Sequence, residues 1–298
     1  MTSVPTEASA SSRPRSARYR PLNAIVTGLG EIAGRRRLTR YLVGANLKRT
    51  HADTLFGQLW WVLDPLLQMA VYIVLVTIIF ARKTPDYPLF VFAAVLPWKW
   101  FTTGLADATQ SITTRQQLIR QIQFPKIILP TSAIVAETVS FAFGMIALAI
   151  VYLFFRDRIT GWLLLMPVVA GAQFLFTMAL AIFLSAANAF FRDTQNIERH
   201  ALRLWFYLSP GLYSLAQIEP SHKIIQDLLR LNPFAVLFEA YRAIIWGSEV
   251  SINGTITDLP PGPPDFTALA ALSVVSVGLI LVSIAIFKKA EPSFARIL

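Results

Sequence analysis

Residues 57–72, GQLWWVLDPLLQMAVY, combine the apolar composition of a membrane-crossing helix with side chains that such a helix rarely carries. Trp61, Asp64, Gln68 and Tyr72 recur every three or four residues, which places them on one helical face. A carboxylate is costly among acyl chains, so Asp64 should face protein, water or lipid head groups. A row of aromatic rings and hydrogen-bonding groups suits a sugar chain, because rings stack on its C–H faces and polar groups meet its hydroxyls. Together with Trp60, these residues are our first candidate for the wall of a substrate conduit.

A plainer interpretation covers only the start of this segment. Trp60 and Trp61 then belong to the aromatic belt at the membrane surface, and Asp64 caps a helix that begins beside Pro65. This interpretation leaves Gln68 and Tyr72 unexplained, because they lie one and two turns deeper on the same face.

Residues 201–217 repeat the pattern. Phe206, Ser209, Tyr213 and Gln217 lie on one predicted face, and Pro210 interrupts the backbone hydrogen bonds of the helix. The alternative interpretation is a structural kink packed against its neighbours. We assign these four residues to the same conduit.

Two ionisable residues lie near the middle of predicted membrane segments. Lys99 is deep within one segment and Glu137 within the next, at matching depth. Pairing would offset the desolvation cost of both charges. We therefore expect a Lys99–Glu137 ion pair with a structural role.

Several classes of chemistry are excluded. The chain has no cysteine, its three histidines are far apart, and no GxxxxGK[ST] sequence is present to bind ATP phosphates. We expect no catalytic site, metal or cofactor in this chain, so any energy for transport comes from another subunit. The net charge of +10 has a topological explanation in a membrane protein, and we expect no nucleic-acid partner.

The elements that must position these residues are membrane helices. The 298 residues are 55% hydrophobic with a mean hydropathy of +0.54, and the apolar residues come in runs long enough to cross a bilayer. We predict an all-α polytopic membrane protein with six transmembrane helices, at about 59–80, 89–108, 127–155, 162–190, 201–217 and 266–287.

The basic residues orient this topology. With both termini in the cytoplasm, 19 of the 27 Lys and Arg residues lie on the cytoplasmic side, seven lie outside, and Lys99 lies within a span. The sequence therefore predicts a multi-pass membrane protein with both termini on the cytoplasmic side.

The segments around the spans divide the chain. Residues 1–34 are expected to be a disordered basic tail and lead-in, 59–287 the six-helix domain, and 288–298 a cytoplasmic tail. Residues 35–58 are expected to contain an amphipathic helix along the cytoplasmic membrane surface. Its basic residues suit anionic lipid at that surface, and they are Arg35, Arg36, Arg37, Arg40, Lys48 and Arg49. Residues 220–248 contain two short apolar helices on the outside, before the last span.

The order of these motifs resembles a known family. LKRTHADTLFGQLWWVLDPLLQMAVY, LFVFAAVLPWKWF, QLIRQIQFPKIILP, FFRDTQNIERHALRLWFYLSPGLYS and LNPFAVLFEAYRAIIW are similar to segments of type-2 ABC (ABC-2) polysaccharide exporter permeases. The likeness is to the Wzm-type permeases that export O-antigen, with teichoic acid and actinobacterial galactan exporters as relatives. One departure is GAN at 44–46, where many relatives carry an Arg-Asp pair.

The resemblance implies partners and roles. It implies a homodimer with two copies of a separate Wzt-type ATPase subunit, which binds ATP and Mg, and a glycan on polyprenyl pyrophosphate as substrate. The 112–126 loop would contact the ATPase, and the helices at 220–248 would form an external gate. The coupling residues would be Arg120, Gln123, Phe124, Pro125 and Lys126.

Two alternatives stay open at this point. An ABC-2 permease for a drug or small lipid would share the fold. A polyprenyl-dependent membrane glycosyltransferase would need a catalytic carboxylate on an aqueous loop, for which Asp193 and Glu198 are the available residues.

Overall fold

The computed structural model describes residues 21–50, 54–79, 86–214, 231–252 and 255–297, together with 216, 224, 228 and 229. Within this part of the chain, five helical segments are long and apolar enough to cross a membrane. They are Gly57–Ile78, Tyr87–Gln110, Ile128–Tyr152, Gly161–Phe190 and Phe266–Phe294. The protein is therefore mostly helical and polytopic, as the sequence predicts.

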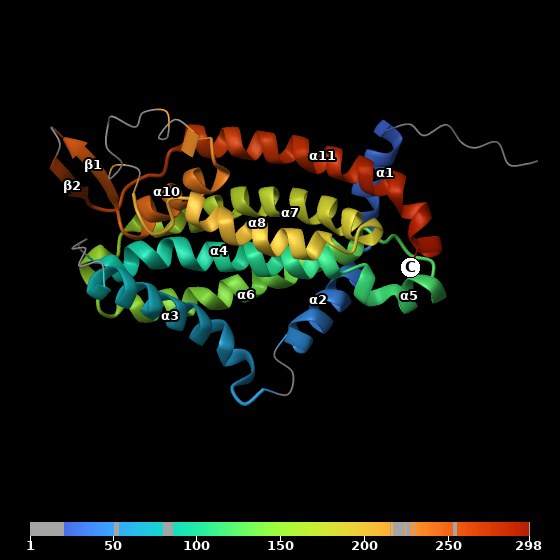
Figure 1. Ribbon diagram of the computed structural model, residues 1–298, viewed down its shortest axis with the longest axis horizontal. Coiled ribbons are helices and arrows are strands. Elements are labelled where there is room, and N and C mark those ends of the chain that lie inside the picture. The colour runs from blue at the N-terminus through green and yellow to red at the C-terminus, as the bar shows by residue number, and fades with distance from the viewer. Residues whose placement is uncertain are drawn as a thin grey trace, which may run out of the picture.

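The long helices run side by side along one axis (Figure 1). Helix α4 (Tyr87–Gln110) lies in the middle, and most of its side chains are buried. The helices around it are α3 (Trp60–Ile73, continued by a π-helical turn at Val74–Ile79), α6 (Ile128–Tyr152), α7 (Met166–Phe190) and α8 (Thr194–Leu208). Helix α11 (Phe266–Ile297) packs along α7.

Short elements occupy the two ends of this bundle. We call one the α5 end, where α5 (Gln116–Gln121) lies near α1 (Pro21–Gly34), α2 (Arg36–Thr50) and the last turns of α11. The opposite α10 end carries α10 (Pro233–Ile245) and an antiparallel hairpin of β1 (Ser248–Ile252) and β2 (Thr255–Leu259). Single 3-10 turns connect the longer elements at Gly57–Leu59, Thr113–Arg115, Arg156–Arg158 and Gly161–Leu165.

Local sequence explains where several helices begin. Helices α4, α7 and α10 each have proline in the first turn, where its missing N–H costs nothing. Asn232 caps α10, because its side-chain oxygen accepts a hydrogen bond from the Phe234 N–H at 3.0 Å.

Three features differ from the sequence predictions. Residues 21–34, for which no helix was predicted, form helix α1, because α1 packs closely on α11; a Cβ at Gly28 would lie 2.4 Å from Ile284. The predicted fifth span is not confirmed. Helix α8 begins at Thr194 and stops before Pro210, so its 15 residues rise about 22 Å, short of a ~30 Å hydrocarbon core. The β1–β2 hairpin was not predicted.

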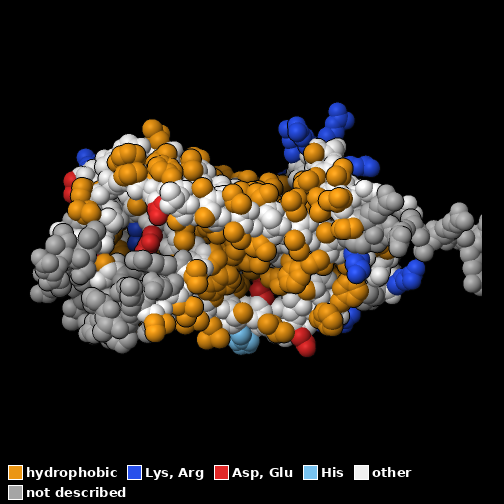
Figure 2. Space-filling view, turned by 90° about the horizontal axis from the view of Figure 1, so that it is seen from above, with side chains coloured by type: hydrophobic (Ala, Val, Ile, Leu, Met, Phe, Trp, Pro, Cys, Tyr) orange, Lys and Arg blue, Asp and Glu red, His pale blue; other side chains and the backbone are white. Residues whose placement is uncertain are grey.

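The surface reflects the membrane environment (Figure 2). Hydrophobic side chains cover the middle of the visible face, and most visible Lys and Arg side chains gather toward the α5 end. An apolar waist between polar ends is the pattern expected of a protein that crosses a bilayer.

Candidate functional site

The structure brings the two predicted conduit segments into contact. The Tyr72 ring of α3 lies 5.8 Å from the Phe206 ring of α8, centroid to centroid, and the Phe206 ring lies 5.3 Å from Trp98 of α4. The Gln68 side chain interacts with the Tyr72 hydroxyl one turn away. We call Tyr72, Trp98 and Phe206 the aromatic cluster. Rings from the two predicted helices therefore meet, with an amide one turn away, and Trp98 is a member that the sequence did not identify.

The start of the α3 face has a different environment. Trp61 is 8% exposed and its ring packs against Phe143 at 4.9 Å, whereas Trp60 is half-buried and contacts Phe56. Trp61 thus fills space between helices and does not lie in an aromatic belt. It borders a cavity of about 140 Å³ between α3, α4 and α6.

The charges in this cavity correct the predicted ion pair. The Lys99 Nζ lies 2.7 Å from Asp64 Oδ2, so Lys99 pairs with Asp64. The predicted Lys99–Glu137 pair is therefore wrong. Glu137 is buried and lines the same cavity. Matching depth could not decide between the two carboxylates, because it does not specify the rotation of each helix about its axis.

The conduit candidates that follow helix α8 do not share one environment. Ser209 is 1% exposed; its hydroxyl donates to the Trp205 carbonyl at 2.7 Å and accepts from Asn232 Nδ2 at 2.8 Å. It therefore joins α8 to the start of α10, and its predicted position in a conduit wall is wrong. Tyr213 is half-buried just beyond α8, and Gln217 lies outside the described residues.

A polar groove leads from the α5 end to the aromatic cluster. It has a volume of about 460 Å³, runs between α4 and α8, and ends at Trp98. Its wall carries Thr102 and Gln110 from α4 and Arg199 and Arg203 from α8. The buried carboxylate of Glu198 borders it, next to the Thr109 hydroxyl. The i, i+4 spacing of the two arginines was a signal in the sequence that a search for uninterrupted apolar spans passed over.

Helix α2 presents its charges outward. All six basic candidates are exposed, while Leu42 and Asn46 are buried against the bundle. The Asn46 side-chain oxygen accepts a hydrogen bond from Arg115, so Asn46 holds α2 to the turn before α5. Burial lowers the pKa of Arg115, and the nearby positive charge of Arg49 lowers it further. The six exposed basic residues are Arg35, Arg36, Arg37, Arg40, Lys48 and Arg49.

The predicted coupling loop has an exposed tip and a fixed base. Arg120 and Gln123 are exposed, and Phe124 is half-buried and packs against the core. The Lys126 N–H donates to Glu291 Oε1 at 2.7 Å, which attaches the loop to the last turns of α11. Pro125 is half-buried beside it.

Glu291 also belongs to a charge cluster. Lys288 Nζ lies 2.6 Å from Glu291 Oε2 and 2.5 Å from Glu31 Oε2, and the Lys288 side chain is 10% exposed. We call Glu31, Lys288 and Glu291 the basal clamp. It joins α1, α11 and the base of the loop, so a displacement of the loop acts on all three.

Comparison with known proteins places this sequence in a family. The family model described as ABC-2 type transporter matches residues 38–246. The O-antigen export system permease protein RfbA of Myxococcus xanthus is 33% identical over 255 residues, which cover 86% of this chain and 93% of that protein. A protein of the same name from Klebsiella pneumoniae is 26% identical over 258 residues, with the same coverage of each chain.

Proposed function

Because the chain belongs to the ABC-2 type transporter family, we propose that it is the permease subunit of an ATP-driven exporter of lipid-linked polysaccharide. Relatives that cover 86% of the chain are named O-antigen export permeases. The observation that carries the proposal is the contact between Tyr72 and Phe206, since it joins α3 to α8 in one aromatic wall beside the α4–α8 groove. Such a wall offers many weak, interchangeable contacts, along which a long sugar chain can slide.

The route of the substrate follows the polar surfaces. In this proposal the glycan enters the α4–α8 groove at the α5 end, which is cytoplasmic, and then passes the aromatic cluster. The exposed arginines of α2 hold the polyprenyl pyrophosphate at the membrane surface, where their charges also attract anionic lipids. The protein lies in the bacterial inner membrane, and α8 belongs to a sixth crossing.

The proposed complex is a homodimer with two ATPase subunits. Apolar side chains stay exposed on α3 at Leu67 and Val71 and on α8 at Leu204 and Leu208, beside the aromatic cluster. A second copy placed against these faces would close the conduit. The ATPase would contact the exposed residues of the 112–126 loop and would supply ATP and Mg. The proposed gate is α10 at the far end.

The alternative is an ABC-2 permease for a drug or small lipid. That substrate needs a closed pocket for one molecule, whereas the groove and the aromatic cluster form an extended path. The names of the relatives also favour the polysaccharide.

Export in reconstituted vesicles tests the proposal. The permease and its ATPase are placed in proteoliposomes with a lipid-linked glycan, and ATP-dependent appearance of the glycan on the opposite side is measured. We expect the glycan to move and a small lipid alone not to move. Transport of the lipid without the glycan would refute the polysaccharide assignment.

A further inference from the structure

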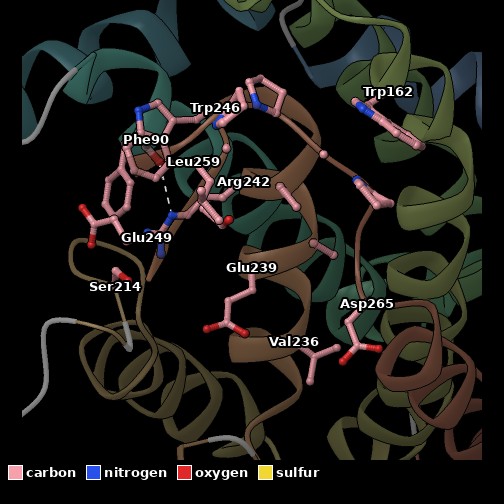
Figure 3. Close-up of a pocket in the computed structure, with 18 of the residues that line it drawn as sticks. Phe90, Trp162, Ser214, Val236, Glu239, Arg242, Trp246, Glu249, Leu259 and Asp265 are labelled. Atoms are coloured by element: carbon pink, nitrogen blue, oxygen red, sulfur yellow. Dashed lines mark hydrogen bonds between the residues drawn. The ribbon is translucent and has the colours of Figure 1, made fainter. Parts of the chain in front are cut away.

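A second, larger cavity lies at the α10 end, away from the aromatic cluster. Its volume of about 690 Å³ falls in the range of small-molecule sites. Its walls come from α10, the base of the hairpin, the proline-rich linker before α11, and Trp162 (Figure 3). Figure 3 shows Trp162 and Asp265 on one side of the cavity, Phe90 and Glu249 on the other, and Glu239 between them.

The cavity is preformed. Gly247 has φ 127°, and a Cβ there would lie 2.0 Å from the Leu259 carbonyl oxygen, so only glycine allows the linker to pass. The Gly262 N–H donates to the Ala243 carbonyl at 2.8 Å, which fastens the linker to α10. Arg158 donates to the Trp246 carbonyl at 3.2 Å while it pairs with Asp86. A site held this way loses little conformational freedom when a ligand binds.

The buried arginine of the cavity is already engaged. Arg242 donates to the carbonyls of Gly211 and Tyr213, and its guanidinium lies 3.7 Å from the centroid of the Phe90 ring. Burial lowers the pKa of Arg242 to about 10, and the negative charge of Glu239 partly offsets this lowering. The group therefore stays charged at neutral pH. Three of its donors are therefore directed at protein carbonyls, two in the turn after α8 and one at Phe90, which Nε reaches at 3.5 Å.

Carboxylates make up the other charged groups of the cavity, beside the hydroxyls of Ser214 and Ser248. Glu239, Glu249 and Asp265 line the cavity, so its three carboxylates outnumber its one arginine. Asp265 Oδ1 accepts from the N–H groups of Thr267 and Ala268 and from the Thr267 hydroxyl. The structure gives Oδ2 of Asp265 no hydrogen bond among the described residues. Such a site repels phosphate and accepts hydroxyl or ammonium donors.

An aromatic face completes the site. Trp162 is 40% exposed, so its ring is open to a ligand and not covered by packing. A ring of this kind stacks on an apolar face while carboxylates accept the polar hydrogens around it. The cavity therefore matches a molecule with a C–H face and a rim of hydroxyl groups.

We propose that this cavity is a second carbohydrate site, on the external side, which takes an uncharged sugar segment of the emerging glycan. The inference rests on the function and orientation proposed above. Its position gives it a role: Arg242 borders the cavity and also holds the turn that follows α8. A bound sugar is thereby next to the residue that fixes the end of the conduit helix.

Binding to defined oligosaccharides tests the inference without transport. The full-length permease, labelled and placed in nanodiscs, is applied to an array of uncharged hexose tetrasaccharides and of the same compounds bearing one phosphate or one amino group. We expect uncharged and amino-bearing sugars to bind and phosphate-bearing ones to bind at least about tenfold more weakly, because the carboxylates of the cavity repel phosphate and accept hydroxyl and ammonium donors.

Variants locate the binding. Trp162→Ala and Glu239→Gln should each weaken binding of the uncharged sugars about tenfold, while Trp162→Phe retains a ring and most of the binding. Leu164→Ala and Asp157→Asn are matched controls, since both residues are exposed near Trp162 but do not line the cavity. All variants must elute and melt like the unsubstituted protein.

The outcomes separate the two proposals. Equal binding by Trp162→Ala, preference for the phosphate-bearing sugars, or binding of tetramethylammonium in place of every sugar would overturn this site. Export in vesicles together with absent array binding refutes only the external site. Array binding that depends on Trp162 without any export refutes only the proposed function.

Discussion

Replacement of Asp64 should destabilise the protein less than replacement of Lys99, although the two residues form one ion pair. Lys99 lies 2.7 Å from Asp64 in a cavity that also contains Glu137. In Asp64→Asn, Lys99 keeps a second carboxylate within the same cavity. In Lys99→Gln, both carboxylates lose their only cation there.

The magnitudes follow from burial. Breaking a fully buried pair costs about 3–5 kcal/mol, but these side chains are 29% and 41% exposed, which reduces the cost. We expect about 1 kcal/mol for Asp64→Asn and about 2–3 kcal/mol for Lys99→Gln. The double variant Asp64→Asn/Glu137→Gln leaves Lys99 without a carboxylate, so its cost should exceed the sum of the two single costs by about 1 kcal/mol.

Unfolding by a denaturing detergent, followed by tryptophan fluorescence, measures these free energies. Glu137→Gln alone should cost less than Lys99→Gln, and Trp60→Phe serves as a control for fluorescence changes that do not report stability. Strictly additive costs, or a larger cost for Asp64→Asn than for Lys99→Gln, would show that Glu137 does not share the cation.

The other predictions concern transport and helix stability. Phe206→Ala should lower ATP-dependent glycan export at least about tenfold in vesicles while the complex still assembles, because it removes a ring contact from the aromatic cluster. Glu291→Gln weakens the basal clamp, so we expect ATP hydrolysis to continue with export reduced several-fold, measured as sugars moved per ATP hydrolysed. Asp265→Ala removes the cap of α11 and should cost about 1 kcal/mol in detergent unfolding. Hydrogen bonds from Thr267 and Ala268 lower the pKa of Asp265, so its stabilisation is present above its unfolded pKa of about 3.9 and is lost as pH falls through the lower folded value.

The two transport variants have matched controls. Ile197→Ala shortens an exposed side chain of α8 that lies outside the groove and the aromatic cluster, and Lys289→Gln removes an exposed charge two residues from Glu291. Export as low in Ile197→Ala as in Phe206→Ala would remove the special role of the ring. Unchanged coupling in Glu291→Gln would refute the clamp, and an unchanged acid limb in Asp265→Ala would refute the cap.

Patterns along the chain were sufficient to predict what depends on single helices. The apolar runs located five crossings, and the three-to-four residue spacing placed Tyr72 and Phe206 on faces that the structure brings together. What depends on two helices at once was harder to predict. Lys99 pairs with Asp64 and not with Glu137 because of how α3, α4 and α6 are each rotated about their own axes, and residue spacing does not reveal that rotation.

Elements stabilised by distant contacts were also missed. Helix α1 is held by α11, through the close approach at Gly28 and the pair of Glu31 with Lys288. Ser209 bonds with Asn232, which is 23 residues away in the chain. The external cavity combines residues from five separate segments, and no local motif marks it.

Photo-crosslinking during export tests the central claim most directly. A photoreactive phenylalanine analogue is placed at Tyr72 in one protein and at Val274, an exposed residue of α11, in another. The account predicts that the glycan is crosslinked at position 72 and that only lipid is crosslinked at position 274. Lipid alone at position 72, with glycan export intact, would contradict a sugar conduit lined by α3 and α8.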